Sequence, residues 1–119
     1  MASGFGIGID NVLHFYQFEN TKEEAAICEQ FKLHCYFNNT IHPYVFSADT
    51  HLLAQLDNTF IKGITLTAPG FYAPQGRAVG YTLTHPEFYN DLRSFRHLDW
   101  RITNIEMETA TMFGLSRVL

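Results

Sequence analysis

FIKGITLTAPGFYAPQGR, residues 60–77, changes character partway along its length. In residues 60–67, apolar and β-branched side chains alternate with others, which predicts a β-strand. The next ten residues contain two Pro and two Gly, which is typical of an ordered loop rather than a helix or a strand. A strand that ends in a stiff loop is the first half of the pattern that decides the fold.

The second half is a strand that runs directly into a helix near the end of the chain, WRITNIEMETATMFGLSRV, residues 100–118. Residues 100–105 predict a strand, and Met107-Glu108 open a helix whose small and apolar residues recur at helical spacing. Upstream, the sequence predicts strands at 2–9 and 43–47, and helices at 21–36, at 49–56 and from Thr84 onward. This alternation indicates an α/β fold with helices flanking a sheet.

Side chains at the predicted helix starts support these assignments. Thr21 followed three residues later by Glu24 has the pattern of a capping box. Asp49 or Ser47 can cap the second helix. In the third, Thr84-His85-Pro86-Glu87 predicts a start with Pro in the first helical position and an acid in the first turn.

Composition bounds the chain to one modest domain and excludes several classes of function. The 119 residues are 46% hydrophobic, which argues against disorder, and only 17% charged, below the ~25% of typical domains. A net charge of −4 with scattered Lys and Arg argues against binding to nucleic acid. No apolar run approaches the ~18 residues that span a membrane, and the N-terminus has no signal-peptide pattern, so we expect a cytoplasmic protein.

Several familiar chemistries have no support in the sequence. The six histidines lack the short paired spacing of metal ligands, so we expect no metal. No G-x-S-x-G nucleophile motif occurs. The glycines among residues 4–8 do not match G-x-G-x-x-G, so we expect no phosphate loop there. Cys28 and Cys35 fit neither a zinc nor a redox motif and are predicted to be buried, unreactive thiols.

The loop after residue 67 carries candidate ligand-binding side chains. Pro74 stiffens the backbone before Gln75, which offers an acceptor and two donors, and Arg77 offers a fork of donors. If the loop is extended, Gln75 and Arg77 point to the same side and can read a planar ring with a C=O/N–H/C=O edge. Phe71 can cover the face of that ring. The alternative is an ordinary turn with a surface Gln and Arg.

A pair of carboxylates, Glu106 and Glu108, stands at the other candidate position. Each follows a predicted strand, as the loop does, and ligands of open α/β sheets bind beyond the carboxyl ends of strands. A helix N-terminus stabilises their charge, and a carboxylate can accept hydrogen bonds from both hydroxyls of a ribose. The alternative is a pair of solvated acids that complement the helix dipole.

Taken together, GITLTAPGFYAPQGR at 63–77 and RITNIEMETATMFGLSR at 101–117 resemble the uridine phosphorylase branch of the nucleoside phosphorylase family. ASGFGIGIDNVLHFY at 2–16 resembles, more weakly, the strand and loop that enter the same site. The resemblance implies a three-layer α/β/α fold with a central mixed sheet. It also implies phosphate-dependent cleavage of uridine to uracil and ribose 1-phosphate, with inorganic phosphate as co-substrate and no cofactor.

Carried over by residue, the resemblance implies that Gln75 and Arg77 bind the uracil edge and that Phe71 packs on the base. It implies that Glu108 binds the ribose hydroxyls, that Met107 packs under the sugar and that Glu106 supports the site. Arg77 and Glu108 would carry the catalysis, because an arginine donor stabilises charge on the departing base and a carboxylate stabilises the cationic sugar.

The sequence also departs from the family pattern. Family members are longer, and their phosphate-binding Gly-rich segment and arginines precede the position of Met1. We therefore expect residues 1–119 to be the middle to late portion of an incomplete domain, inactive and poorly soluble alone. The intact protein would form a homo-oligomer, a dimer or a hexamer.

Three alternatives stay open. A purine nucleoside phosphorylase or a nucleosidase of the same family would share the E-M-E motif, Glu106-Met107-Glu108, although Gln75 and Arg77 suit a pyrimidine. A non-catalytic nucleoside-binding module would keep the base and ribose pockets without phosphate groups. A structural α/β domain would make both motifs accidental.

Overall fold

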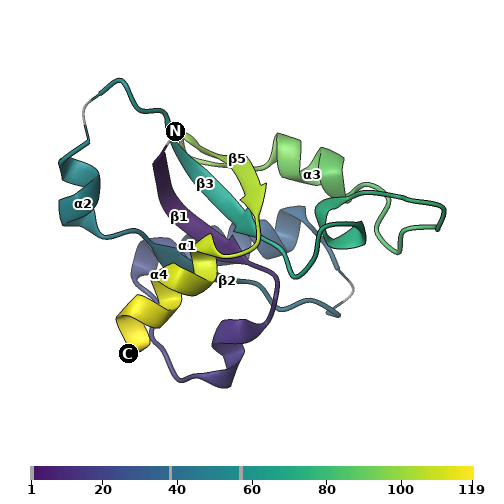
Figure 1. The fold of residues 1–119 in the computed structure, drawn as a ribbon, viewed down its shortest axis with the longest axis horizontal. Helices are drawn as coiled ribbons and strands as arrows, with labels where there is room; N and C mark the ends of the chain where they lie inside the picture. Colours follow the sequence, from purple (N-terminus) through teal and green to yellow (C-terminus); the bar gives the residue numbers. More distant parts are fainter. Residues whose placement is uncertain (1, 38, 57) are drawn as a thin grey trace.

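A single mixed sheet organises the parts of the chain that the computed structural model describes, residues 2–37, 39–56 and 58–119. Its strand order is β2-β1-β3-β5-β4, with β1, β3 and β5 parallel and the outer strands β2 and β4 antiparallel to their neighbours. The arrows of the three parallel strands point the same way in Figure 1. The strands are β1 Ala2–Gly8, β2 Tyr44–Ser47, β3 Lys62–Thr67, β4 Arg96–His97 and β5 Trp100–Glu106.

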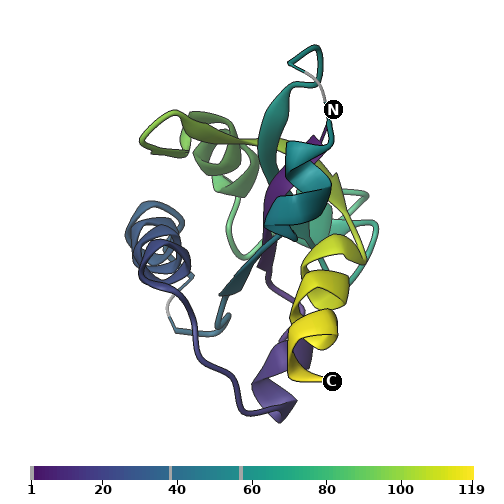
Figure 2. The ribbon, with the colours of Figure 1, turned by 90° about the vertical axis from the view of Figure 1, so that its left-hand side faces the viewer.

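Helices cover both faces of this sheet. Figure 2 shows α1 and α3 on one side of it and α4 on the other. The helices are α1 Lys22–His34, α2 Thr50–Ala54, α3 Phe88–Ser94 and α4 Thr109–Val118, and short 3₁₀ turns occur at Val12–Phe15 and Ala73–Gln75. The α/β fold with helices on both sides of a mixed sheet is therefore confirmed.

Two apolar clusters, one on each face, hold the layers together. On the first face, Ile7 of β1 and Leu66 of β3 pack with Phe31 of α1 and with the apolar side of α3. On the second face, Phe46 of β2 packs with Ala110 of α4 and its neighbours. Burial of such side chains from water is the main force that joins the layers.

Gly6 of β1 and Gly114 of α4 allow the helix to lie close to the sheet. A Cβ added to Gly6 would lie 2.6 Å from the Cα of Ala110, a distance that real Cβ atoms do not show. Gly114 of α4 is packed as closely against Leu13 and Phe46. Gly6 therefore serves helix packing, whereas Gly4 and Gly8 leave room for the rings of Trp100 and Tyr44.

The N-terminus of α1 follows the predicted capping box. The Thr21 hydroxyl accepts from the backbone N–H of Glu24 at 3.2 Å, and the Glu24 carboxylate accepts from the N–H of Thr21 at 2.8 Å. Asp49, one of the two caps considered for α2, accepts from two backbone N–H groups of that helix. The starts of α1 and α2 can be predicted from the sequence because a capping residue lies within a few residues of the N–H groups that it caps.

The predicted start of α3 is wrong. Helical structure begins at Phe88, Glu87 is the N-cap, and the preceding residues form a turn closed by the hydrogen bond from Phe88 N–H to the His85 carbonyl. Pro86 therefore lies in this turn instead of in the first helical position. Phe88 is also the first buried side chain of the segment, so the helix begins where packing against the core begins.

Both cysteines lie in the first apolar cluster, as predicted. Burial raises the pKa of Cys35 to about 12 and also raises that of Cys28. Thiols of this kind remain protonated at neutral pH and are poor nucleophiles.

Candidate functional site

The candidate site lies at the end of the sheet where the carboxyl ends of the three parallel strands meet, which we call the sheet edge below. Asp10 follows β1, Thr67 ends β3 and Glu106 ends β5, and Thr67 is paired with Glu106 in the register of the sheet. The two segments that the sequence singled out thus leave adjacent strands at one edge. Ligands of α/β sheets bind in this region.

Hydrogen bonds from these strand ends fix the first turn of α4. The Thr67 hydroxyl donates to Oε1 of Glu106 at 2.7 Å and accepts from the backbone N–H of Ala110 at 2.8 Å. Oε2 of Glu106 accepts from the backbone N–H groups of Glu108 and Thr109, both at 2.7 Å. The backbone N–H groups at the start of α4 thereby donate to side chains at the ends of β3 and β5, and the N-cap residue Glu108 makes no side-chain cap of its own.

Both oxygens of the Glu106 carboxylate therefore accept hydrogen bonds from the protein itself. Burial by itself would raise the pKa of Glu106, but the hydrogen bonds from the Thr67 hydroxyl and the two backbone amides outweigh it and lower the pKa. The carboxylate stays charged at neutral pH and supports the turn that carries Glu108.

Glu108 differs from Glu106 in its surroundings. It is exposed, and its carboxylate has no partner among the described residues. Met107, between the two acids, is 43% exposed. One acid of the pair is thus held by the fold and the other is free to meet a ligand, an asymmetry that sequence spacing alone does not reveal.

A second connection ties α4 to the end of β1. The hydroxyls of Tyr44 and Thr111 donate to the two carboxylate oxygens of Asp10 at 2.5 and 2.9 Å. Burial and the neighbouring Asp10 raise the pKa of Tyr44, so its phenol remains a donor. Sequence reasoning missed Asp10, Tyr44, Thr67 and Thr111; the position of Asp10 directly after a predicted strand was the one available signal.

The loop of residues 68–77 is turned, not extended. Residues Ala73–Gln75 form a 3₁₀ turn that ends at Gly76 with a positive φ of 80°. The condition under which Gln75 and Arg77 would align, an extended loop, is not met, because the Pro-containing turn and the left-handed glycine fold the chain back. The turn brings the two side chains together by another route.

Phe71, Gln75 and Arg77 form a loop cluster at the surface. The Arg77 guanidinium donates to the Gln75 side-chain oxygen at 2.9 Å and to the backbone carbonyl of Phe71, and it lies 4.1 Å from the centroid of the Phe71 ring. All three predicted base-reading residues therefore gather in one place. The guanidinium keeps further N–H groups available for a ligand.

A cleft of about 480 Å³ opens beside this cluster. Ile9, Phe37 and Phe88 give it apolar walls, and the loop contributes Ala73 and Pro74. Its polar lining comes from Asp10, Asn11, Thr84 and His85. A cleft with apolar walls and a few polar groups, of this size, is typical of small-molecule sites.

The six predicted site residues do not line the cleft themselves. The loop cluster is adjacent to it through Ala73 and Pro74, and the turn that carries Glu108 starts from the same sheet edge. Asn11, in the left-handed region with φ 64°, is a lining residue that sequence reasoning did not single out. The candidate site thus has three parts, the cleft, the loop cluster and the exposed Glu108, on segments that follow the ends of the parallel strands.

Other kinds of site find no support in the described part of the chain. No group of three or more His, Cys, Asp or Glu side chains lies close enough to hold a metal ion there. Among the helices of residues 2–37, 39–56 and 58–119, none has the length and apolar character needed to cross a membrane.

Comparison with known proteins gave one informative result. No protein-family model matches the chain, and no curated protein matches it. Among solved structures, a nucleoside phosphorylase of Trypanosoma brucei with uridine phosphorylase activity is similar, with a TM-score of 0.81 and 28% identity. The match covers 97% of this chain and 43% of that protein, so the chain spans less than half the length of the protein it resembles.

The chain therefore has the α/β fold found in a nucleoside phosphorylase. The similarity extends over nearly all of its residues and supports a relationship with nucleoside phosphorylases.

Proposed function

We propose that this chain is the part of a uridine-cleaving nucleoside phosphorylase that holds the base and the ribose. The reaction would transfer the ribosyl group of uridine to inorganic phosphate, giving uracil and ribose 1-phosphate. The observation that carries the proposal is that β3 and β5 end side by side, so that the loop of Phe71, Gln75 and Arg77 and the turn with the exposed Glu108 both begin there. The likeness to a phosphorylase with uridine phosphorylase activity supports it.

The base would be read by the loop cluster. A uracil edge presents two carbonyl acceptors around one N–H donor, and Arg77 with Gln75 supplies the complementary donors and acceptor. On binding, uracil would replace the hydrogen bond between Arg77 and Gln75 with bonds to its own edge. Phe71 would pack on the ring face.

The sugar would be held by the turn at the start of α4. Glu108 would accept hydrogen bonds from the two ribose hydroxyls, Met107 would pack beneath the sugar, and Glu106 would keep the turn in place. Because charge builds on uracil and the sugar becomes cationic as the bond breaks, Arg77 and Glu108 would both bind the transition state more tightly than the substrate.

Phosphate would serve as co-substrate, with no cofactor. We expect its binding residues upstream of Met1, and we expect the whole protein to be a cytoplasmic homo-oligomer, a dimer or a hexamer. Its partners would be small molecules, without nucleic acid or membrane.

The experiment is cleavage of uridine followed by ultraviolet absorbance, with and without phosphate. It would use the 119-residue chain and a longer version that adds the residues a complete phosphorylase carries on both sides. Phosphate-dependent cleavage of uridine by the longer version supports the proposal. Cleavage at a rate that does not depend on phosphate would indicate a nucleosidase. Faster cleavage of inosine than of uridine would indicate the purine branch.

One observation favours a second candidate, a nucleoside-binding module without catalysis. The described residues that line the cleft include Asp10 and His85 but no Lys or Arg, so this part of the described structure offers phosphate no permanently charged cation. Saturable binding of uridine by the longer version, with no turnover at any phosphate concentration, would support this candidate.

A further inference from the structure

Thr67 lies at the carboxyl-terminal end of β3, the central strand of the sheet. It is the last residue of β3, and its side chain is fully buried. Its hydroxyl donates to Glu106 on β5 and accepts from the Ala110 N–H on α4, so one oxygen links three elements. Both interactions are shorter than 2.9 Å. A buried hydroxyl with both a donor and an acceptor satisfied is fixed in orientation.

The orientation of the Glu106 carboxylate depends on this hydroxyl. The last torsion of a glutamate side chain has only broad preferences, so a carboxylate takes its direction from the donors around it. Thr67 holds Oε1, and this leaves Oε2 to accept from the N–H groups of Glu108 and Thr109. The backbone direction at Glu108 therefore follows from the position of the Thr67 hydroxyl.

We propose that Thr67 is a positioning residue that, through Glu106, aims the Glu108 carboxylate at the ribose hydroxyls. The inference rests on the proposed function, because it assigns Glu108 to the ribose. It adds a residue that is not among the six predicted site residues. Its role is confined to the sugar, since among the described residues the Thr67 hydroxyl is hydrogen-bonded to Glu106 and Ala110 and not to the loop cluster that would read the base.

The chain offers a matched control on the same strand. Thr65 is also fully buried, and its hydroxyl is hydrogen-bonded to the Ser3 hydroxyl at 2.5 Å. Thr65→Val thus removes a buried hydroxyl of the same kind, two residues away, without touching Glu106. Comparison of Thr67→Val with Thr65→Val separates positioning from a general loss of stability.

The test measures binding of uridine and of free uracil by equilibrium dialysis, using the 119-residue chain. We expect Thr67→Val to weaken uridine binding about tenfold, which corresponds to the loss of one well-oriented hydrogen bond, and to leave uracil binding within about twofold. Thr67→Ser keeps the hydroxyl and should restore uridine binding. Thr65→Val should leave the ratio of the two affinities unchanged.

A spectroscopic readout accompanies binding. In the ¹⁵N-resolved NMR spectrum, Thr67→Val should shift the amide signals of Glu108 and Thr109, and Thr67→Ser should return them. Thr67→Cys serves if the valine variant does not fold, because a thiol is a weak donor of similar size.

The outcomes separate the two ideas. An unchanged ratio of uridine to uracil affinity in the Thr67 variants would overturn the positioning role even if wild-type protein binds uridine well. If the wild-type chain binds neither compound, the proposed function fails for this chain. The amide signals then decide the positioning role, and their constancy in Thr67→Val would overturn it.

Discussion

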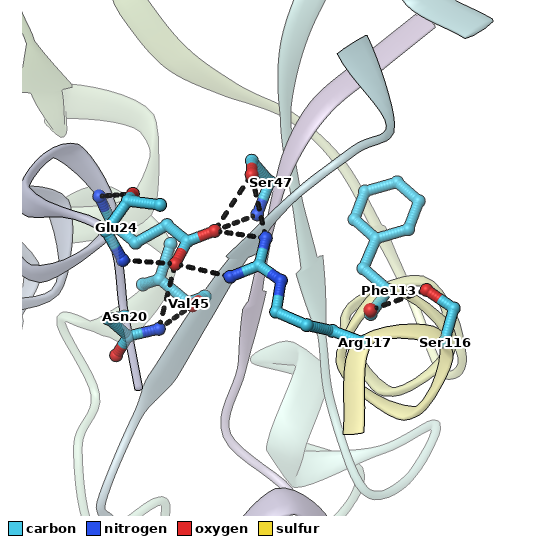
Figure 3. Close-up of polar contacts among 8 residues, drawn as sticks. Asn20, Glu24, Val45, Ser47, Phe113, Ser116 and Arg117 are labelled. Atoms are coloured by element: carbon cyan, nitrogen blue, oxygen red, sulfur yellow. Dashed lines mark hydrogen bonds and ion pairs between the residues drawn. The ribbon is translucent and has the colours of Figure 1, made fainter. Parts of the chain in front are cut away.

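Arg117 on the last turn of α4 and Glu24 on the first turn of α1 form a two-point ion pair across the molecule. The two guanidinium nitrogens donate to the two carboxylate oxygens at 2.8 and 2.6 Å (Figure 3). The Glu24 carboxylate also accepts from the backbone N–H groups of Thr21 and Ser47. The carboxylate is fully buried and satisfied by donors from three directions, whereas the Arg117 side chain is 35% exposed.

Loss of the arginine should destabilise the fold strongly. Removing one partner of a buried pair leaves an uncompensated charge, so we expect Arg117→Ala to lower the free energy of unfolding by about 3 kcal/mol. Urea denaturation at pH 7 measures the change. Lys32→Ala, which breaks the exposed pair of Lys32 with Glu29 within α1, is the control and should cost less than about 0.5 kcal/mol. Equal effects of the two variants would contradict the assignment.

Glu24 also predicts how stability depends on pH. Burial by itself would raise its pKa, but the hydrogen bonds from Arg117 and from the Ser47 and Thr21 amides outweigh it and lower the pKa to about 2. Because the pKa in the folded state lies below the unfolded value, Glu24 stabilises the fold above about pH 4.5, and this contribution is lost as the pH falls toward 2. Denaturation between pH 5 and pH 2.5 should show this loss, with a smaller slope in Glu24→Gln.

The capping box at Thr21 and Glu24 shows what the sequence could predict. It depends on residues three apart, so the start of α1 was readable from the chain. The pairing of Glu24 with Arg117 was not, because it joins residues 93 positions apart and neither residue type specifies a partner at that distance. The same carboxylate was thus predicted in its local role and missed in its long-range role.

In the candidate site, too, local features could be predicted from the sequence and long-range contacts could not. The sequence predicted that the two motifs follow strands, and parallel pairing of β3 with β5 then placed their ends side by side. It did not predict Thr67, whose partners Glu106 and Ala110 lie about forty residues away. The loop geometry was missed because Gly76 in a left-handed conformation reverses the chain.

Close packing between β1 and α4 should make Gly6 intolerant of any side chain. The Cβ of Gly6→Ala would meet backbone atoms of Ala110, which cannot rotate away, so α4 must shift. We expect a loss of about 3 kcal/mol in the free energy of unfolding, at the upper end for overpacking. Gly70→Ala, whose Cβ would meet only the Pro74 ring at 3.4 Å, should change it by less than about 1 kcal/mol. Thermal unfolding of both variants would show the contrast, and a stable Gly6→Ala protein would refute the packing argument.

Arg77 should matter for the base and not for the fold. Its side chain is exposed, and in the described structure its hydrogen bonds stay within its own loop, so Arg77→Ala should leave the unfolding free energy within about 0.5 kcal/mol. Loss of a charged donor should weaken uracil binding about tenfold to a hundredfold. Equilibrium dialysis with uracil measures this, and Arg93→Ala on exposed α3 surface is the control. Unchanged uracil binding in Arg77→Ala would remove this residue from the site.

Substitutions of the two acids of the E-M-E motif should differ in their effect on the stability of the protein. Glu108 is free, so Glu108→Gln should weaken uridine binding without changing uracil binding or the free energy of unfolding. Glu106 accepts hydrogen bonds from Thr67 and from two backbone amides, so Glu106→Gln should weaken uridine binding and also destabilise the protein by about 1–3 kcal/mol. Urea denaturation and equilibrium dialysis on the same samples would test both halves. Destabilisation by Glu108→Gln equal to that of Glu106→Gln would mean that both acids serve the fold, and the ribose would then have to be held elsewhere.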